Sequence, residues 1–260
     1  MPENTASMCT RTESGLGCNS TIGNLRVRAR VFQAGRKIVM PCHCCEIENK
    51  TFGEAGAKAN LKKYRRRGPA KQTRMILEAA RSLGIKNATL LDVGGGIGTI
   101  HHELLNDIAS TAAHVDASAA YLKIAKEEAQ RLGHDGRVEF IHADFTDVAG
   151  GLPQADVVTL DRVVCCYPNF RELLKAASSK CRKAIALTYP RETWYVKAII
   201  SAMNLFQRLR RDPFRVFVHP VNEMESLLNG EGFQRTSTRR LFVWEMSLYR
   251  KLAEQGGDFN

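Results

Sequence analysis

Hydrophobic and polar positions along this chain of 260 residues predict strands and helices in alternation. Short apolar runs of strand length are separated by longer segments whose apolar residues recur at helical spacing. The predicted strands are Thr89–Val93, Ala112–Val115, Val138–His142, Asp156–Leu160 and Ala184–Thr188. Strands that alternate with helices at this spacing form a parallel sheet through right-handed crossovers. The pattern therefore predicts an α/β domain.

Helical spacing also extends beyond this alternating region. It runs from Phe52 to Leu83 before the first strand, with a break at Gly68-Pro69. The remaining predicted helices are Ile100–Ile108, Ser118–Leu132, Phe170–Ser178, Trp194–Arg210 and Asn222–Leu228. The helix Trp194–Arg210 is not required by the alternation, and a glycine-containing turn then leads to a terminal strand, Leu241–Tyr249.

The most specific local pattern follows the first predicted strand. The segment Asp92–Gly98 has the spacing Asp-x-Gly-x-Gly-x-Gly and leads into a helix. Glycines without a Cβ allow a ligand to approach the backbone closely, and the helix start offers free N–H groups. A dinucleotide fingerprint would need glycine or alanine at position 99, where this chain has Thr99. The segment therefore departs from the fingerprint of NAD-binding proteins, and NAD is not the favoured cofactor.

This segment resembles motif I of the class I S-adenosylmethionine-dependent methyltransferases, and the resemblance covers about residues 60–250. It implies a Rossmann-like methyltransferase fold of the α/β class. That fold has a mostly parallel seven-stranded sheet, helices on both faces, a last strand inserted antiparallel and extra lid helices. It also implies S-adenosyl-L-methionine as the cofactor. NAD or a glycine-rich turn without a ligand are the alternatives.

The resemblance assigns cofactor-binding roles to residues at and after the strand ends, where parallel sheets bind ligands. Gly94, Gly96 and Gly98 would form the turn, and Asp92 would hold that turn in its conformation. Gly94 and Gly96 would approach the amino-acid portion of the cofactor. Asp116 would accept hydrogen bonds from both ribose hydroxyls, because a carboxylate offers two acceptor oxygens.

Three further residues complete the predicted cofactor site. Asp144 would accept a hydrogen bond from the adenine amine, Phe145 would flank the ring, and Asp161 would contact the cofactor's amine. Taken singly, each aspartate is equally compatible with a helix cap or a turn. Their occurrence after successive strands, together with the glycine motif, favours binding of an adenosine cofactor.

Tyr167 and His219 are the candidate catalytic residues. Methyl transfer to a good nucleophile depends on alignment and exclusion of water, so a base is optional. Tyr167 follows the fourth strand and would line the acceptor pocket, and His219 would act as a base near neutral pH. The alternatives are a core tyrosine and a structural or surface histidine.

A weaker resemblance concerns magnesium-protoporphyrin O-methyltransferases, which methylate a propionate carboxylate. The similar stretches are Gly68–Thr73, Asp161–Pro168, Tyr189–Trp194 and Phe217–His219. Cys166 stands where those enzymes usually have a histidine before Tyr-Pro. This difference leaves the acceptor open.

The chain carries a net charge of +11 and has a pI of about 9.4. The basic residues cluster at Lys58, Lys62, Lys63, Arg65, Arg66 and Arg67, at Arg208, Arg210 and Arg211, and at Arg235, Arg239 and Arg240. Such clusters suit nucleic acid, an anionic membrane surface or an acidic small molecule, or are solvated helix faces. We expect the segments 62–67 and 194–210 to form a lid over the methyl end of the cofactor.

The composition predicts a globular domain over residues 46–252, preceded by a disordered or Cys-rich segment, 1–45, and followed by a flexible tail, 253–260. No apolar run reaches the length of a membrane span. Residues 1–39 are basic and poor in acidic residues, which fits an organelle-targeting leader or a start codon placed too early. A cytoplasmic protein is expected, and the sequence assigns no oligomeric state.

No metal site is predicted, although the chain has eight cysteines. Cys42-His43-Cys44-Cys45 contains one Cys-x-x-Cys pair, and only Cys9 and Cys18 could supply a second pair. We therefore expect free thiols and no stoichiometric zinc at Cys42 and Cys45.

The sequence thus predicts a methyltransferase that acts on a small-molecule acceptor, with O-methylation of a carboxylate or an aromatic compound as the expected reaction. The alternatives are methylation of RNA or protein, which the basic charge allows, and a non-catalytic adaptor that keeps the fold. The Asn/Asp-Pro-Pro-Tyr/Phe motif of DNA amino-methylation is missing from the sequence.

Overall fold

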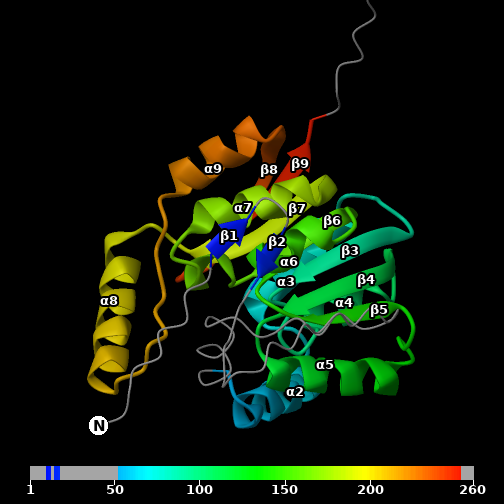
Figure 1. Cartoon of the computed structure of the whole chain (residues 1–260), viewed down its shortest axis with the longest axis horizontal. Coiled ribbons are helices and arrows are strands. Elements are labelled where there is room, and N and C mark those ends of the chain that lie inside the picture. Colours follow the sequence, from blue (N-terminus) through cyan, green and yellow to red (C-terminus); the bar gives the residue numbers. More distant parts are fainter. Residues whose placement is uncertain (1–9, 13–14, 18–51, 253–260) are drawn as a thin grey trace, which may run out of the picture. The chain divides into compact units, whose positions relative to one another are not determined.

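The computed structural model describes residues 10–12, 15–17 and 52–252 (Figure 1). The chain divides into two units, residues 1–38 and 39–260. In the first unit, the strands β1 (Thr10–Thr12) and β2 (Gly15–Gly17) pair antiparallel. The predicted Cys-rich segment at 42–45 and the tail 253–260 lie outside the described residues.

A mixed sheet of seven strands organises residues 52–252, in the order β5-β4-β3-β6-β7-β9-β8. The first five run parallel, and β9 is inserted antiparallel between β7 and β8. The strands are β3 (Ala88–Val93), β4 (Ala109–Asp116), β5 (Val138–His142), β6 (Ala155–Asp161), β7 (Cys181–Pro190), β8 (Phe233–Arg240) and β9 (Trp244–Lys251). The predicted Rossmann-like sheet, with its antiparallel last strand, is confirmed.

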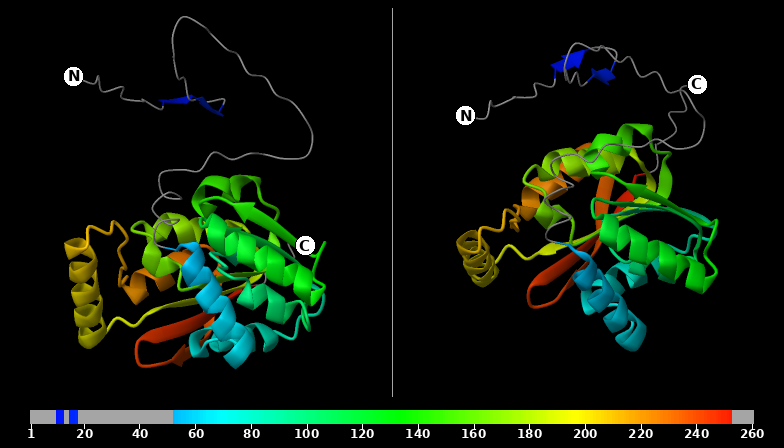
Figure 2. Two further views of the ribbon diagram at one scale, coloured as in Figure 1. Left: turned by 90° about the horizontal axis from the view of Figure 1, so that it is seen from below. Right: turned by 60° about the horizontal axis from the view of Figure 1, so that its bottom comes forward.

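Helices cover both faces of this sheet (Figures 1 and 2). On one face α3 and α4 pack on β3, β4, β6, β7 and β9, and α5 packs on β4 and β5, while α7 and α9 lie on the other face. The helices are α2 (Glu54–Arg67), α3 (Lys71–Arg81), α4 (Thr99–Leu104), α5 (Ala119–Leu132), α6 (Phe145–Val148), α7 (Phe170–Ser179), α8 (Trp194–Leu209) and α9 (Val221–Gly230), with 3-10 turns at Ala149–Gly151 and Val164–Cys166. None of the helices in the described ranges is long and apolar enough to cross a membrane.

The inner strands are apolar because both of their faces are covered. Leu91 and Val158 contribute to the core under α7 and α9, whereas Leu90 and Val157 contribute to the core under α3 and α4. Adjacent residues of one strand thus supply two cores. Burial from both sides fixes the register of the strands, and with it the edge at which β3, β4 and β6 end.

One predicted helix is shorter in the structure, and one strand has no predicted counterpart. The helix predicted for 100–108 ends at Leu104, where the chain turns. Ile108 lies beyond the helix but still packs on the core, so the apolar spacing in the sequence continues past the end of the helix. The strand β8 was not predicted as a separate element. Its residues between Phe233 and Arg240 are mostly polar or basic, as suits an edge strand that pairs with β9 alone.

An ion-pair cluster holds α2 against α5. The carboxylate of Glu128 on α5 is fully buried and accepts hydrogen bonds from Arg65 Nε at 3.1 Å and from Arg131 Nη2 at 2.7 Å. These bonds, with that of Arg131 the largest effect, lower the pKa of Glu128 to about 2 despite its burial. The cluster fixes the position of α2, which carries three residues that face the candidate site, Asn60, Lys63 and Tyr64.

We expect Glu128→Gln to lower the free energy of unfolding at pH 7 by about 1–2 kcal/mol, since both arginines are half-exposed and solvent screens the pair. Because the pKa of Glu128 is lowered on folding, its contribution is present above the unfolded value and is lost as the pH falls toward 2. Urea unfolding at pH 7 and pH 3 measures this difference. Glu127→Gln removes the same charge from an exposed neighbouring position and serves as the control. Equal effects of the two variants would contradict the assigned role.

Candidate functional site

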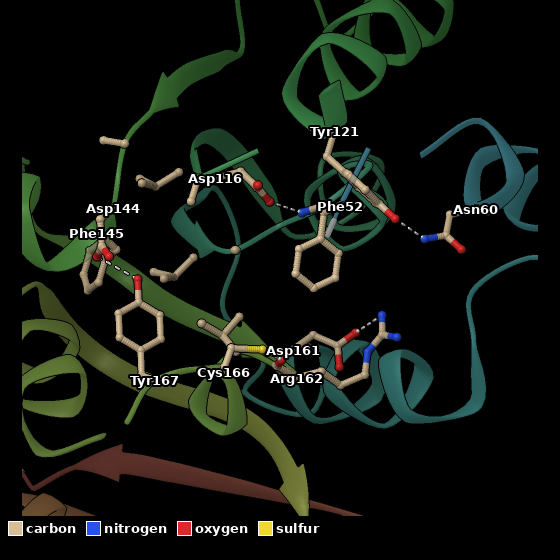
Figure 3. Close-up of a pocket in the computed structure, with 17 residues that line it drawn as sticks. Phe52, Asn60, Asp116, Tyr121, Asp144, Phe145, Asp161, Arg162, Cys166 and Tyr167 are labelled. Carbon is tan, nitrogen blue, oxygen red and sulfur yellow. Dashed lines mark hydrogen bonds and ion pairs between the residues drawn. The ribbon is translucent and has the colours of Figure 1, made fainter. Parts of the chain in front are cut away.

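A cavity opens beyond the carboxyl ends of β3, β4 and β6 (Figure 3). A second cavity lies beside it, toward α2 and α3. The residues that line both cavities are Asn60, Gly94, Gly96, Tyr121, Asp161 and Arg162. The two cavities therefore share a wall, and a ligand long enough to occupy both would pass over the glycine loop.

The glycine loop forms this shared wall because its backbone adopts conformations that favour glycine. Gly94, Gly96 and Gly98 have φ values of +58°, +59° and +83°. A Cβ on Gly94 would lie 2.5 Å from a methyl carbon of Val163, so the loop after β6 packs directly on it. At Gly96 the space on the Cβ side is open except for Tyr121 at 3.6 Å. The loop thus exposes bare backbone to the cavities at Gly96.

Asp116 joins this loop to the end of β4. One carboxylate oxygen, Oδ2, accepts a hydrogen bond from Gly96 N–H at 2.8 Å, and Oδ1 accepts one from Ser118 N–H at 2.8 Å. Each carboxylate oxygen has a second lone pair, and Asp116 lines the first cavity. The carboxylate therefore shapes the loop and still has acceptor capacity for a ligand diol.

Asp144 and Phe145 form the opposite wall of the first cavity (Figure 3). Asp144 caps α6 and accepts hydrogen bonds at Oδ1 from Thr146 N–H at 3.0 Å and from Tyr167 O–H at 2.7 Å. Phe145 is buried. Tyr167 also lines this cavity, and its hydroxyl is directed to Asp144.

Asp161 and Arg162 end β6 and lie between the two cavities. Thr188 and Thr73 donate hydrogen bonds to the two carboxylate oxygens of Asp161, each at 2.6 Å. Arg162 has a φ of +61°, which is unusual for a residue with a side chain and concentrates at functional sites. Its N–H donates to Thr188 Oγ1 at 2.9 Å, which supports this strained conformation.

These features fit S-adenosylmethionine. The first cavity combines a carboxylate with acceptor capacity, Asp116, with apolar walls from Val93, Val115 and Phe145 that suit a purine ring. The bare backbone at Gly96 leads from this cavity into the second one. A ligand with an adenosine half and a charged amino-acid half matches that division.

Comparison with known proteins identifies the same type of domain. Residues 90–212 match the family of the methyltransferase domain. Among curated proteins none matches the sequence.

Solved structures share the fold at low sequence identity. Magnesium protoporphyrin IX methyltransferase from Synechocystis PCC 6803, with bound S-adenosylhomocysteine, matches with a TM-score of 0.63 and 16% identity over 80% of this chain and 100% of its own. An O-methyltransferase family protein from Burkholderia thailandensis matches with a TM-score of 0.61 and 18% identity over 80% of this chain and 64% of its own. These likenesses confirm the predicted class I methyltransferase fold. The match of residues 90–212 to the methyltransferase domain supports the predicted enzyme that depends on S-adenosylmethionine.

Two of the predicted cofactor-binding residues lie below the cavities of the methyltransferase. Asp92 is fully buried and accepts a hydrogen bond from Thr159 Oγ1 at 2.8 Å. A Cβ on Gly98 would collide with the ring of His101, so Gly98 packs on buried side chains. Neither residue lines the two cavities, and their contacts support the loop from beneath. Burial raises the pKa of Asp92.

The candidate base His219 also lies outside both linings. Its Nε2–H donates to the backbone carbonyls of Val164 at 3.1 Å and Tyr167 at 2.9 Å, and its ring packs on Phe170 at 4.6 Å. Burial lowers the pKa of His219, although the two hydrogen bonds act in the opposite direction. The structure therefore gives this side chain a positioning role for the segment that carries Tyr167.

Of the two segments predicted as a lid, one contributes to a cavity wall and the other does not. Lys63 and Tyr64 of α2 line the second cavity. No residue of α8 lines either cavity, because only Val196 and Ile200 of this helix are buried and the other apolar side chains face outward. The apolar and basic residues in 194–210 therefore lie on an exposed helix face, and they do not cover the cavities.

Sequence reasoning missed several wall residues. Phe52, Asn60, Tyr121 and Arg162 line the first cavity. Asn60 donates to Tyr121 Oη at 2.8 Å, and Phe52 packs edge-to-face on the same ring at 6.0 Å. Tyr121 lies within the helix predicted for 118–132, with no role in the site assigned to it. Its place in the first turn of the helix after Asp116 was a signal for a site residue.

We expect His219→Gln to make folding stability less sensitive to acid. The pKa of His219 is lowered on folding, so the unfolded chain binds the additional proton and the native protein loses stability as the pH falls below about 6.5. The Gln side chain keeps an N–H donor for the two carbonyls and does not titrate. Urea unfolding from pH 8 to pH 5 should therefore show the wild type losing stability relative to the variant. Parallel curves for the two proteins would refute this assignment.

Proposed function

We propose that this methyltransferase transfers the methyl group of S-adenosylmethionine to a small-molecule acceptor that carries an anionic group. The observation that carries the proposal is the pair of adjoining cavities that share the glycine loop, Asp161 and Arg162. One cavity suits the adenosine, and the other is bordered by basic and hydroxyl groups.

The cofactor supplies an electrophilic methyl group on a positively charged sulfur. Asp116 would accept from the ribose hydroxyls, and Asp144 and Phe145 would bind the adenine. Gly94, Gly96 and Asp161 would hold the amino-acid portion. The hydrogen bonds that already fix Asp116, Asp144 and Asp161 pre-organise these acceptors before any ligand binds.

The lining of the second cavity favours an anionic acceptor. Lys63, Gln72 and Arg162 supply donors, whereas the hydroxyl of Thr73 already donates to Asp161, the one carboxylate in this lining. Two threonine hydroxyls and the guanidinium of Arg162, 3.5 Å away, compensate its charge. The remaining field is positive, which suits the cofactor's own carboxylate and an acidic acceptor beside it.

A small molecule is favoured over RNA because acidic partners occupy one of the three basic clusters, that of β8. Arg235, Arg239 and Arg240 of β8 each form an ion pair with a glutamate, Glu225, Glu78 and Glu245 respectively. Arginines held in this way cannot contact phosphates without breaking those pairs. The cavity-lining acids and the open glycine loop likewise favour an active enzyme over an adaptor that has lost its ligand.

Catalysis would rest on alignment and exclusion of water. Tyr167 lies in the wall of the first cavity, where its hydroxyl donates to Asp144. This bond holds the tyrosine ring as a fixed wall. A carboxylate acceptor is itself the nucleophile, so no protein base is required for its methylation.

S-adenosylhomocysteine should raise the melting temperature of the protein, because it binds the native state alone. Asp116→Ala removes an acceptor and the link to the loop, and Gly96→Val places a side chain in the open space, so each should abolish the shift. Asp147→Ala, at an exposed aspartate of α6, should leave it unchanged. Stabilisation by NAD and none by S-adenosylhomocysteine would overturn the proposal.

A screen of metabolite extracts with radiolabelled S-adenosylmethionine should yield a labelled small acid. With that acceptor, Arg162→Gln should raise KM about tenfold or more, since a charge-assisted hydrogen bond contributes about 1.5–3 kcal/mol. Arg208→Gln, at an exposed arginine of α8, should not change it. Labelled RNA as the product, with binding that weakens steeply in log salt, would instead establish the RNA alternative.

A further inference from the structure

A cluster of buried histidines lies directly beneath the glycine loop. His101 and His102 on α4, His114 on β4 and His134 after α5 are all at most 3% exposed. The rings of His101 and His102 lie 4.2 Å apart, and those of His101 and His114 lie 4.8 Å apart. Asp92, at 0% exposure, adjoins this cluster.

Several polar atoms of this cluster lack a hydrogen-bond partner. Within the part of the chain that the structure describes, these atoms are Nε2 of His101, Nε2 of His102 and both ring nitrogens of His114. The nearest acidic atom to His114 Nε2 is Asp116 Oδ2 at 3.9 Å, which is beyond hydrogen-bond distance. An unpaired buried polar group costs about 1–3 kcal/mol, so this concentration of them requires a compensating partner.

We propose that Asp92, His101 and His114 bind a zinc ion. Each residue offers one ligand atom, and these atoms all lie within 4.8 Å of one another. His101 Nδ1 and Asp92 Oδ2 are 3.2 Å apart, close to the separation of about 3.3 Å between two ligands of one tetrahedral zinc ion. Two imidazoles and a carboxylate form a donor set that divalent zinc accepts.

The surroundings already orient the ligands. Thr159 Oγ1 donates to Oδ1 of Asp92 at 2.8 Å and leaves Oδ2 for the ion. Phe140 packs on His114 and on His101, with ring centroids 5.6 and 6.0 Å apart. A water molecule can complete the tetrahedral set, because zinc sites with three protein ligands take a water at the fourth position.

The ion would have a structural role, because none of its three ligands lines a cavity. The glycine loop rests on these residues. A Cβ on Gly95 would lie 2.6 Å from Asp92 Oδ2 and 3.1 Å from His114 Cε1. Zinc at this position would fix the base of the loop that shapes both cavities. The ligands come from β3, α4 and β4, so no local spacing in the sequence indicates the site. The proposal differs from the expectation, drawn from the sequence, that the protein has no metal site.

Elemental analysis of the full-length protein, purified without chelators and also after incubation with Zn²⁺, tests this proposal. We expect about one zinc per chain. X-ray absorption at the zinc edge should show nitrogen and oxygen ligands, with at least two imidazoles and no sulfur. No stoichiometric zinc in either sample, or a shell containing sulfur, would overturn the site. These measurements need no cofactor, so their outcome is independent of the proposed function.

Variants locate the ion. His101→Gln and His114→Gln should each reduce the zinc content to about a tenth or less. His142→Gln, at a histidine that bonds the Ala117 carbonyl outside this cluster, should retain it. The triple variant Cys42→Ala, Cys44→Ala, Cys45→Ala should also retain it. Loss of zinc in the cysteine variant alone would refute the histidine site. If the histidine variants fail to fold, the absorption spectrum of the wild type decides.

Discussion

One hydrogen bond, from Gly96 N–H to the carboxylate of Asp116, joins the loop after β3 to the end of β4. The cavities depend on this link because it holds a backbone that only glycine adopts readily. Without a side chain at Gly96, the loop has no packing of its own on the cavity side. Asp116 sets the conformation of the loop from one side, and the buried side chain of Asp92 supports the loop from below.

This arrangement separates two tasks that the sequence motif combines. Gly96 and Asp116 face the cavities, whereas Asp92 and Gly98 face the interior. The motif residues are thus of two kinds, those that would touch a ligand and those that hold the loop in place. Arg162, with its strained backbone, also helps to hold the glycine loop in place, because the next residue, Val163, packs on Gly94.

Much of this could be predicted from the sequence, for identifiable physical reasons. Buried parallel strands produce uninterrupted apolar runs, so β3 and β6 were evident, and parallel strands bring their final aspartates to one edge. The wall formed by Phe52 and Asn60 could not be predicted, because it depends on how α2 packs on α5 through Glu128. The outward face of α8 was misread, because apolar periodicity alone does not distinguish a buried from an exposed helix face.

The antiparallel insertion of β9 has a consequence for the order of folding. The strands β3 to β7 can pair as they emerge during synthesis, because each has its neighbour earlier in the chain or close by. By contrast, β8 is made before β9 and has no other partner in the sheet. Until β9 is complete, the exposed edges of β7 and β8 are open to pairing with other chains. Closure of the sheet is therefore a late, non-local step, and a nascent chain stalled before Trp244 would be exposed to aggregation at these two edges.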